Sequence, residues 1–219
     1  MEPSRLGRRR VNLQALARKT ARRRALLDAA DRAIRRAGPG VTMDEIAAEA
    51  GTAKPVLYRH FGDKGGLYQA LAQRYVQVVM DAIRDATRDQ DHPRARLEAA
   101  IDAYLAVVET SPEIYRFLMH RAVTERAEAQ ATVADFIHQL GGELAADLGD
   151  RLHRFGLDTE GAEPWARGIV GMVQVAGDWW LEHRAAMPRE RLVDHLVGLL
   201  WLGFSGLSSS AGESPQEAI

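Results

Sequence analysis

The sequence predicts an all-α protein with a small N-terminal helical domain and a larger C-terminal one. Three observations support this fold class. Apolar residues recur three or four positions apart through most of the 219 residues, which is the period of helices that pack on one side. No stretch shows the alternation of apolar and polar residues that is typical of half-buried strands. Residues 42–61 have the pattern of two short helices joined by a tight turn.

Composition sets the broad class of the protein. Hydrophobic residues make up 46% and charged residues 27%, as in an ordinary globular domain. The absence of cysteine excludes disulfides and thiolate metal sites. No apolar run approaches the roughly 18–20 residues of a membrane span, and no apolar core follows the basic N-terminus as in a secretory signal. We therefore expect a cytoplasmic protein with no metal, no cofactor and no membrane partner.

The net charge of −1 hides an asymmetry between the two ends of the chain. Residues 1–24 contain nine basic residues and one acidic residue, so this segment carries +8 and the remainder −9. A basic end on an acidic body is expected when only that end touches phosphate; the alternative is a solvated tail that aids solubility. The nine basic residues are Arg5, Arg8, Arg9, Arg10, Arg18, Lys19, Arg22, Arg23 and Arg24.

The first helix is predicted over residues 20–37. It ends at the Gly38-Pro39-Gly40 run, where neither glycine nor proline continues a helix. Residues 1–19 hold too few apolar side chains to fold alone, and we expect a mobile arm whose arginines could enter a minor groove. The helical spacing rests on Leu26, Ala30, Ala33, Ile34 and Ala37.

Two further helices follow within residues 42–61. Thr42 and Glu45 have the spacing of a capping box, and Gly51 can supply the left-handed conformation that ends the first of the two helices. Thr52 is expected to be the N-cap of the second, which tolerates Pro55 in its first turn.

The second of these helices has two different sides. Leu57 and Phe61 are four residues apart and are expected to point inward. A short helix with an anchored inner side and a cationic, aromatic outer side suits the major groove of DNA. The outer residues are Lys54, Pro55, Tyr58 and Arg59, with Val56 and His60 at the edges.

This stretch also resembles the signature of the TetR family of bacterial transcriptional regulators. The resemblance covers about residues 20–70, and Pro55 and the pair Gly65-Gly66 depart from it, because a glycine and an acidic pair are commoner there. Its most specific part is the spacing of Leu57, Tyr58, His60, Phe61, Lys64 and Leu67.

The resemblance implies the domain organisation and the activity. A basic flexible arm would cover residues 1–19, a helix-turn-helix DNA-binding domain 20–66, a helical effector-binding and dimerisation domain 67–207, and a disordered tail 208–219. It implies a homodimer that binds a palindromic operator in double-stranded DNA. It also implies a repressor that a small apolar effector releases.

The DNA contacts are assigned partly by resemblance and partly from residue chemistry. The resemblance implies phosphate contacts from Thr42, Thr52, Tyr58, His60 and Lys64. Lys54 and Arg59 suit guanine O6 and N7, and Pro55 or Val56 suits a thymine methyl. The alternative for Tyr58 and His60 is simple packing between helices. The expected core residues are Ile46, Leu57, Phe61 and Leu67.

Beyond the motif the pattern stays helical. Asp63 is expected to cap a helix that runs to about Arg88, and Ser111-Pro112 separates two later segments. Gly141-Gly142 falls inside one predicted helix as a weak point. The later helical segments are expected at residues 97–108, 114–119, 133–155, 160–184 and 188–207.

The family resemblance implies that the last two helices form the dimer interface. The alternative is that their apolar residues do no more than complete the core of the single protomer. The interface residues are Trp165, Ile169, Met172, Leu192, Leu196, Leu199 and Leu200. The resemblance also implies an effector pocket in the C-terminal domain, although each candidate residue is more often plain core or surface than a ligand contact. The pocket residues are Tyr104, Phe117, Met119, Phe136 and Trp179, with His120, His138 or Asp178 as polar groups. The segments 115–117 and 123–125 resemble a TetR subgroup of lipid metabolism that includes sensors of acyl-CoA.

Two other classes of function compete with this interpretation. An enzyme is disfavoured because the sequence has no glycine-rich phosphate loop and no His-Glu-x-x-His motif. Ser205 lacks the spacing of a nucleophile elbow. We therefore expect no catalytic residues. The second alternative is a helix-turn-helix dimer that binds DNA constitutively without an effector.

Overall fold

The computed structural model describes residues 5–124 and 127–210, and the described residues form helices joined by short connections. The all-α prediction is confirmed. The helices are α1 (Arg5–Ala37), α2 (Met43–Glu49), α3 (Lys54–Phe61), α4 (Lys64–Thr87), α5 (Pro93–Thr110), α6 (Pro112–Thr124), α7 (Ala127–Arg154), α8 (Ala162–His183) and α9 (Arg189–Ser210). They divide into two compact units, one within Met1–Arg74 and Glu113–Thr132 and the other within Tyr75–Pro112 and Val133–Ile219.

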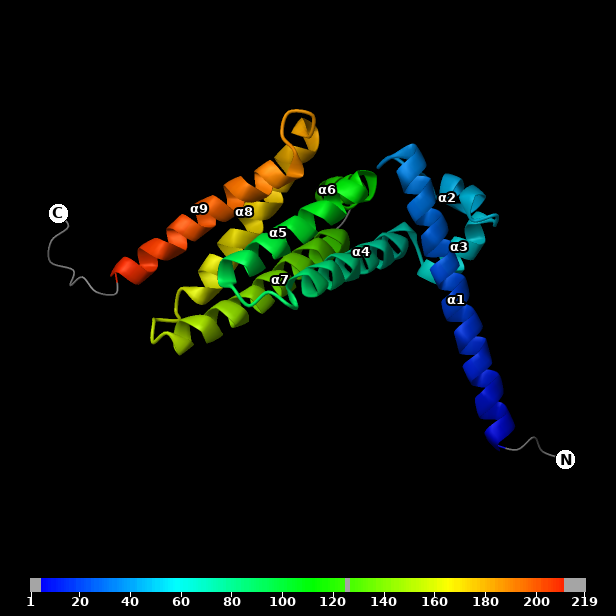
Figure 1. Cartoon of the computed structure of the whole chain (residues 1–219). Helices are drawn as coiled ribbons and strands as arrows, with labels where there is room; N and C mark the ends of the chain where they lie inside the picture. The colour runs from blue at the N-terminus through cyan, green and yellow to red at the C-terminus, as the bar shows by residue number, and fades with distance from the viewer. Residues whose placement is uncertain (1–4, 125–126, 211–219) are drawn as a thin grey trace. The chain divides into compact units, whose positions relative to one another are not determined.

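The first unit is built around the C-terminal half of α1. Helices α2 and α3 lie close to this half (Figure 1). Arg32 and Arg36 of α1 both form ion pairs with Glu49 at the end of α2, the first at 2.9 Å. The predicted core is confirmed, and its main members are Leu26, Ile34, Ile46, Leu57, Phe61 and Leu67, each at most 8% exposed.

The N-terminal half of α1 differs from the prediction. Residues 5–19, expected to form an unstructured arm, continue the helix, and this half projects beyond α2 and α3 (Figure 1). Residues 14–25 are all exposed. The chain has no glycine or proline between Arg8 and Ala37, and arginine, alanine, leucine and glutamine favour helix even without a packed side.

Helix α6 belongs to the first unit although it follows α5 in the sequence. The Tyr68 hydroxyl of α4 donates a hydrogen bond to the backbone oxygen of Leu118, and the rings of Tyr68 and Phe117 are 5.5 Å apart. The short segment predicted at residues 114–119 is thus part of a longer helix, which begins after the predicted break at Ser111. This packing holds α6 against the first turns of α4.

In the second unit, α5, α8 and α9 lie side by side (Figure 1). Arg189 at the start of α9 pairs with Asp102 and Glu109 of α5, at 2.9 and 2.8 Å. The fully buried Trp180 donates its indole N–H to the backbone oxygen of Met187 at 2.7 Å, which closes the turn between α8 and α9.

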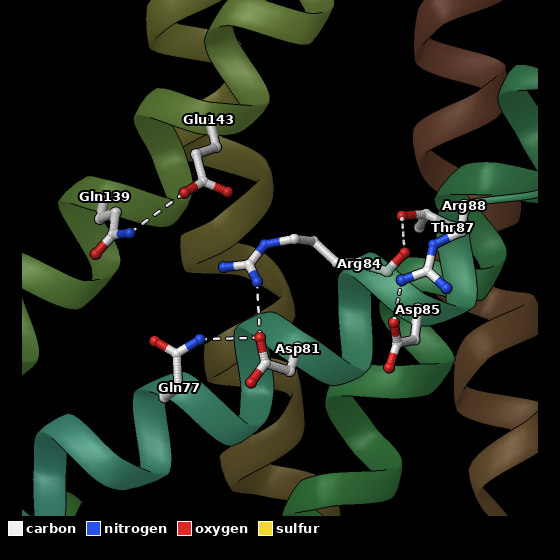
Figure 2. A network of polar contacts seen from close by, with 8 residues as sticks. All are labelled: Gln77, Asp81, Arg84, Asp85, Thr87, Arg88, Gln139 and Glu143. Carbon is white, nitrogen blue, oxygen red and sulfur yellow. Dashed lines mark hydrogen bonds and ion pairs between the residues drawn. The ribbon is translucent and has the colours of Figure 1, made fainter.

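Several polar side chains of α4 and α7 pair within their own helix (Figure 2). Gln77 donates to Asp81 at 2.9 Å, and Arg84 pairs with the same carboxylate at 2.7 Å. Gln139 donates to Glu143 of α7 at 3.2 Å. Pairs three or four residues apart each stabilise a helix by about 0.2–0.5 kcal/mol, so these contacts support the individual helices.

The last helix, α9, ends three residues later than predicted. Residues 208–210, expected to be disordered, are helical because α9 reaches Ser210; residues 211–219 lie outside the described residues. Within the described part of the chain, no helix has the length and apolarity needed to cross a membrane.

Candidate DNA-binding surface

The start of α2 is fixed by the predicted capping box. The backbone N–H of Glu45 donates to Thr42 Oγ1 at 3.3 Å, and the Glu45 carboxylate accepts the backbone N–H of Thr42 at 2.7 Å. The Thr42 hydroxyl donates to the same carboxylate at 2.8 Å. These bonds lower the pKa of Glu45, with the backbone hydrogen bond as the largest cause. The capping prediction is confirmed.

The turn between α2 and α3 is a Schellman motif. Gly51 has φ +58°, and its N–H donates to Ala48 O at 3.0 Å while the N–H of Thr52 donates to Ala47 O at 3.0 Å. The predicted N-cap is therefore wrong by one residue: Thr52 closes α2, and Ala53 is the N-cap of α3, without a side-chain bond.

Helix α3 has the predicted two sides. Leu57 is fully buried and Phe61 is 8% exposed, whereas Tyr58 is 39% exposed. Pro55 and Arg59 are also exposed, and Lys54, Val56 and His60 are intermediate. The anchored inner side leaves a cationic and aromatic outer side that faces solvent.

Lys54 already has a partner in the free protein. Its ammonium group pairs with the carboxylate of Asp44 in the first turn of α2, at 2.9 Å. This hydrogen bond raises the pKa of Lys54. The sequence pattern indicated Lys54 but not Asp44, because the two are ten positions apart and only the geometry of the turn brings them into contact.

His60 lies in a strongly positive environment. Its Nδ1 atom is buried and has no hydrogen-bond partner among the described residues. Burial lowers the pKa of His60, and nearby cations lower it further, so the imidazole is neutral at neutral pH. These cations are Arg59 of α3 and Arg22, Lys19 and Arg23 of α1. The α1 residues were counted in the basic segment, but the sequence did not show that they reach α3.

The connection from α3 to α4 depends on glycine. Gly62 ends α3 with φ +82°, and the Asp63 carboxylate accepts the backbone N–H of Gly66 at 2.8 Å, which confirms the predicted cap. A Cβ on Gly66 would overlap the backbone oxygen of Phe61 and lie 3.0 Å from its carbonyl carbon. The glycine at position 66, one of the two departures from the acidic pair, therefore has a steric reason.

The expected pocket residues belong to both units. Tyr104 is buried in the second unit, and Phe117 is buried in the first against Tyr68. Met119 is intermediate. The side chains of His120 and Phe136 lie outside those the structure describes. His138, Asp178 and Trp179 are exposed on α7 and α8 and do not line the interior of the protomer.

The expected interface residues also separate into two groups. Ile169, Leu192 and Leu196 are at most 8% exposed and belong to the protomer's own core, as the alternative interpretation holds. Leu199 is 63% exposed, and Trp165, Met172 and Leu200 are intermediate. On α8 and α9, Val175, Trp179 and Leu202, which were not predicted to lie in the interface, are also exposed, at 67%, 47% and 74%.

Substitution of Gly66 by alanine is expected to destabilise the protein by about 1–3 kcal/mol, because backbone atoms must move to admit the methyl group. It should also weaken DNA binding, since α3 and α4 meet at this turn. Urea unfolding and operator titration would measure both effects. Gly40→Ala is the matched control, because a Cβ there meets nothing within 4 Å; equal behaviour of the two variants would contradict the steric argument.

Two family models match the chain. The model described as bacterial regulatory proteins, tetR family, matches residues 26–71. The model described as Tetracyclin repressor-like, C-terminal domain, matches residues 82–215.

Relatives agree with the family models. An uncharacterized HTH-type transcriptional regulator of Mycobacterium tuberculosis is 37% identical over 196 residues, covering 89% of this chain and 82% of its own length. The HTH-type transcriptional activator FasR of Mycolicibacterium smegmatis is 31% identical over 201 residues, covering 91% and 89%. The structure of FadR from Bacillus subtilis in complex with stearoyl-CoA has a TM-score of 0.67 at 14% identity, covering 80% of this chain and 96% of that chain. The protein is therefore a regulator and not an enzyme: it belongs to the TetR family of helix-turn-helix transcriptional regulators.

Proposed function

We propose that the protein is a homodimeric repressor that binds a palindromic operator through α3 and leaves it when a small apolar effector binds. The observation that carries the proposal is the division of α3 into a buried and an exposed side. Leu57 and Phe61 hold the inner side in the core, while Tyr58 and Arg59 face solvent. A single helix of this kind fits the major groove, which is about 12 Å wide.

The contacts divide by chemistry. Tyr58 and His60 would donate to phosphate, and the exposed Lys64 would supply charge at the start of α4. Arg59 and Lys54 would reach base edges. Pro55 or Val56 would meet a thymine methyl, and Thr42 and Thr52 would add phosphate contacts beside the two helix starts.

A dimer would join two such helices. Trp179 follows Val175 by four residues on α8, and Leu202 follows Leu199 by three on α9, so each exposed pair shares a helix face. Exposed apolar groups of this size favour burial against another surface. A symmetric pair of subunits can present two recognition helices to half-sites about 34 Å apart.

An effector would act by preferring the conformation that does not fit DNA. FadR of Bacillus subtilis, which shares the fold, is described in complex with stearoyl-CoA. Together with the sequence resemblance to lipid-responsive regulators, this supports a long-chain acyl-CoA or similar apolar molecule. Among the pocket candidates whose side chains the structure describes in the second unit, Tyr104 of α5 is buried. The site of action would be the cytoplasm, where the chromosome lies.

The sign of regulation depends on the operator's position. Repression follows if the operator overlaps the promoter, because bound protein then excludes the polymerase. FasR is named an activator, and an operator upstream of the promoter would produce that outcome here. A promoter–reporter fusion distinguishes the two arrangements.

The experiment that tests the proposal is fluorescence anisotropy with DNA from the gene's own upstream region, against scrambled DNA. We expect specific binding of one dimer per palindrome and release by stearoyl-CoA but not by coenzyme A alone. Specific binding that no acyl-CoA disturbs would favour the constitutive alternative. Mass spectrometry of the denatured protein would detect a ligand that was retained during purification.

Lys64→Ala should weaken binding to operator and scrambled DNA alike and reduce the slope of log K against log salt by about one unit per protomer, because one counterion-releasing contact is lost. His60→Gln should change this slope less than Lys64→Ala does, because burial and the nearby cations lower the pKa of His60 and so disfavour its charged form. Titrations between 50 and 200 mM salt, a range of about fourfold, resolve the difference. If the salt slope changed only in the His60 variant, His60 and not Lys64 would make the charged contact with phosphate.

Leu199→Glu should convert the dimer to monomer and reduce operator affinity at least tenfold, because a charge would be buried in the proposed interface. Phe155→Glu is the matched control, since Phe155 is 78% exposed directly after α7 and belongs to neither α8 nor α9. Sedimentation velocity measures the mass of each variant. A dimeric Leu199→Glu variant would exclude this face as the interface.

A further inference from the structure

The N-terminal half of α1 is a charged helix that the DNA-binding motif does not account for. Between Arg5 and Arg24 the sequence contains nine basic residues and no acidic one, and Asp28 is the first acidic residue of α1. The side chains that the structure describes here are all exposed: Arg18, Lys19, Arg22, Arg23 and Arg24.

This segment lies outside the part of the chain that defines the family. The tetR-family model begins at residue 26, so the basic extension is a feature of this protein beyond the common motif. Within the described side chains of this segment, Arg23 lies over the ring of Phe61, and Arg18, Lys19, Arg22 and Arg24 are exposed to solvent. Like charges four residues apart, such as Lys19 and Arg23, destabilise a helix unless an anion lies against them.

The basic segment begins beside the recognition helix. The Arg23 guanidinium lies 5.0 Å from the ring centroid of Phe61, the last residue of α3. Lys19, Arg22 and Arg23 are also the α1 cations that act on His60. The exposed basic face of α1 is therefore continuous with the C-terminal end of α3, which faces DNA in the proposed function.

We propose that the N-terminal half of α1 is a second DNA-contacting element, which binds phosphates next to those contacted by α3 and α4 and does not read sequence. This inference rests on the proposed DNA-binding mode of α3. At 1.5 Å per residue, the stretch from Arg5 to Arg24 is about 30 Å long. B-DNA carries one phosphate charge per about 1.7 Å of its axis, so several phosphates lie within reach of a helix of this length.

The physical advantage of a helical extension is preorganisation. A disordered arm loses conformational freedom when it binds, whereas side chains on an existing helix lose less. The bound phosphates would in turn relieve the repulsion among the arginines. Both effects increase affinity for DNA of any sequence, and they make that affinity strongly dependent on salt.

The test uses the full-length protein with Arg18→Gln, Lys19→Gln and Arg22→Gln combined. Glutamine favours helix about as well as lysine and arginine, and Arg23 is kept because it packs on Phe61. The control combines Arg84→Gln, Arg88→Gln and Arg167→Gln, which removes the same charge from exposed ion pairs of the second unit. Affinities for operator and scrambled DNA are measured at several salt concentrations, and circular dichroism checks helix content.

The α1 variant should lose about two to three units of salt slope per protomer on both DNAs, at about 0.9 unit per phosphate contact. The ratio of operator to scrambled affinity should stay unchanged, and the control should keep the wild-type slope. Hydroxyl-radical footprints of the variant should lose backbone protection adjacent to each half-site and retain protection within it.

A wild-type slope in the α1 variant, with operator preference intact, would overturn the inference and leave the proposed function standing. A fall in the operator-to-scrambled ratio would also overturn it, since α1 would then read sequence. If wild-type protein showed no operator preference, the proposed function would fail, and the slope on scrambled DNA would still decide the role of α1.

Discussion

The burial of Leu57 and Phe61 is the constraint on which the DNA-binding surface depends. An isolated helix of eight residues is unstable in water, so α3 exists because these two side chains enter the core. Each contributes about 1.5–3 kcal/mol through burial. The turns at Gly51 and Gly62 then fix where α3 begins and ends. The exposed residues carry none of this stabilising role, which leaves their identity free to match DNA.

Charge has two different uses in the first unit. Glu49 pairs with Arg32 and Arg36, and Asp44 pairs with Lys54, so carboxylates of α2 hold cations of both neighbouring helices. Exposed pairs of this kind contribute about 0–1 kcal/mol each, and their main effect is to orient side chains. Between Arg5 and Arg24 of α1 there is no acidic residue. The same helix thus uses positive charge for internal order at one end and presents it to solvent at the other.

Much of the first unit could be predicted from sequence because its signals are local. A capping box or a buried pair four residues apart leaves a direct pattern. Thr52 was misassigned because one residue can close the helix before it or open the helix after it, and only the backbone decides. The roles of Leu192 and Val175 were not predictable from periodicity, because α8 and α9 have apolar residues on inner and outer sides. The spacing of apolar residues shows which face of a helix is apolar, but it does not show whether that face packs in its own protomer or against a second one.

The return of α6 to the first unit has a consequence for biosynthesis. The contact between Tyr68 and Leu118 joins residues 50 positions apart, and translation proceeds at about 5–20 residues per second. At that rate, synthesis of the residues from Tyr68 to Leu118 takes roughly 2.5–10 s, and during this time the α4 surface around Tyr68 is uncovered. Its folding cannot finish in the order in which it is made. A fragment that ends at Arg74 would remain permanently in this uncovered condition, which makes it prone to aggregate.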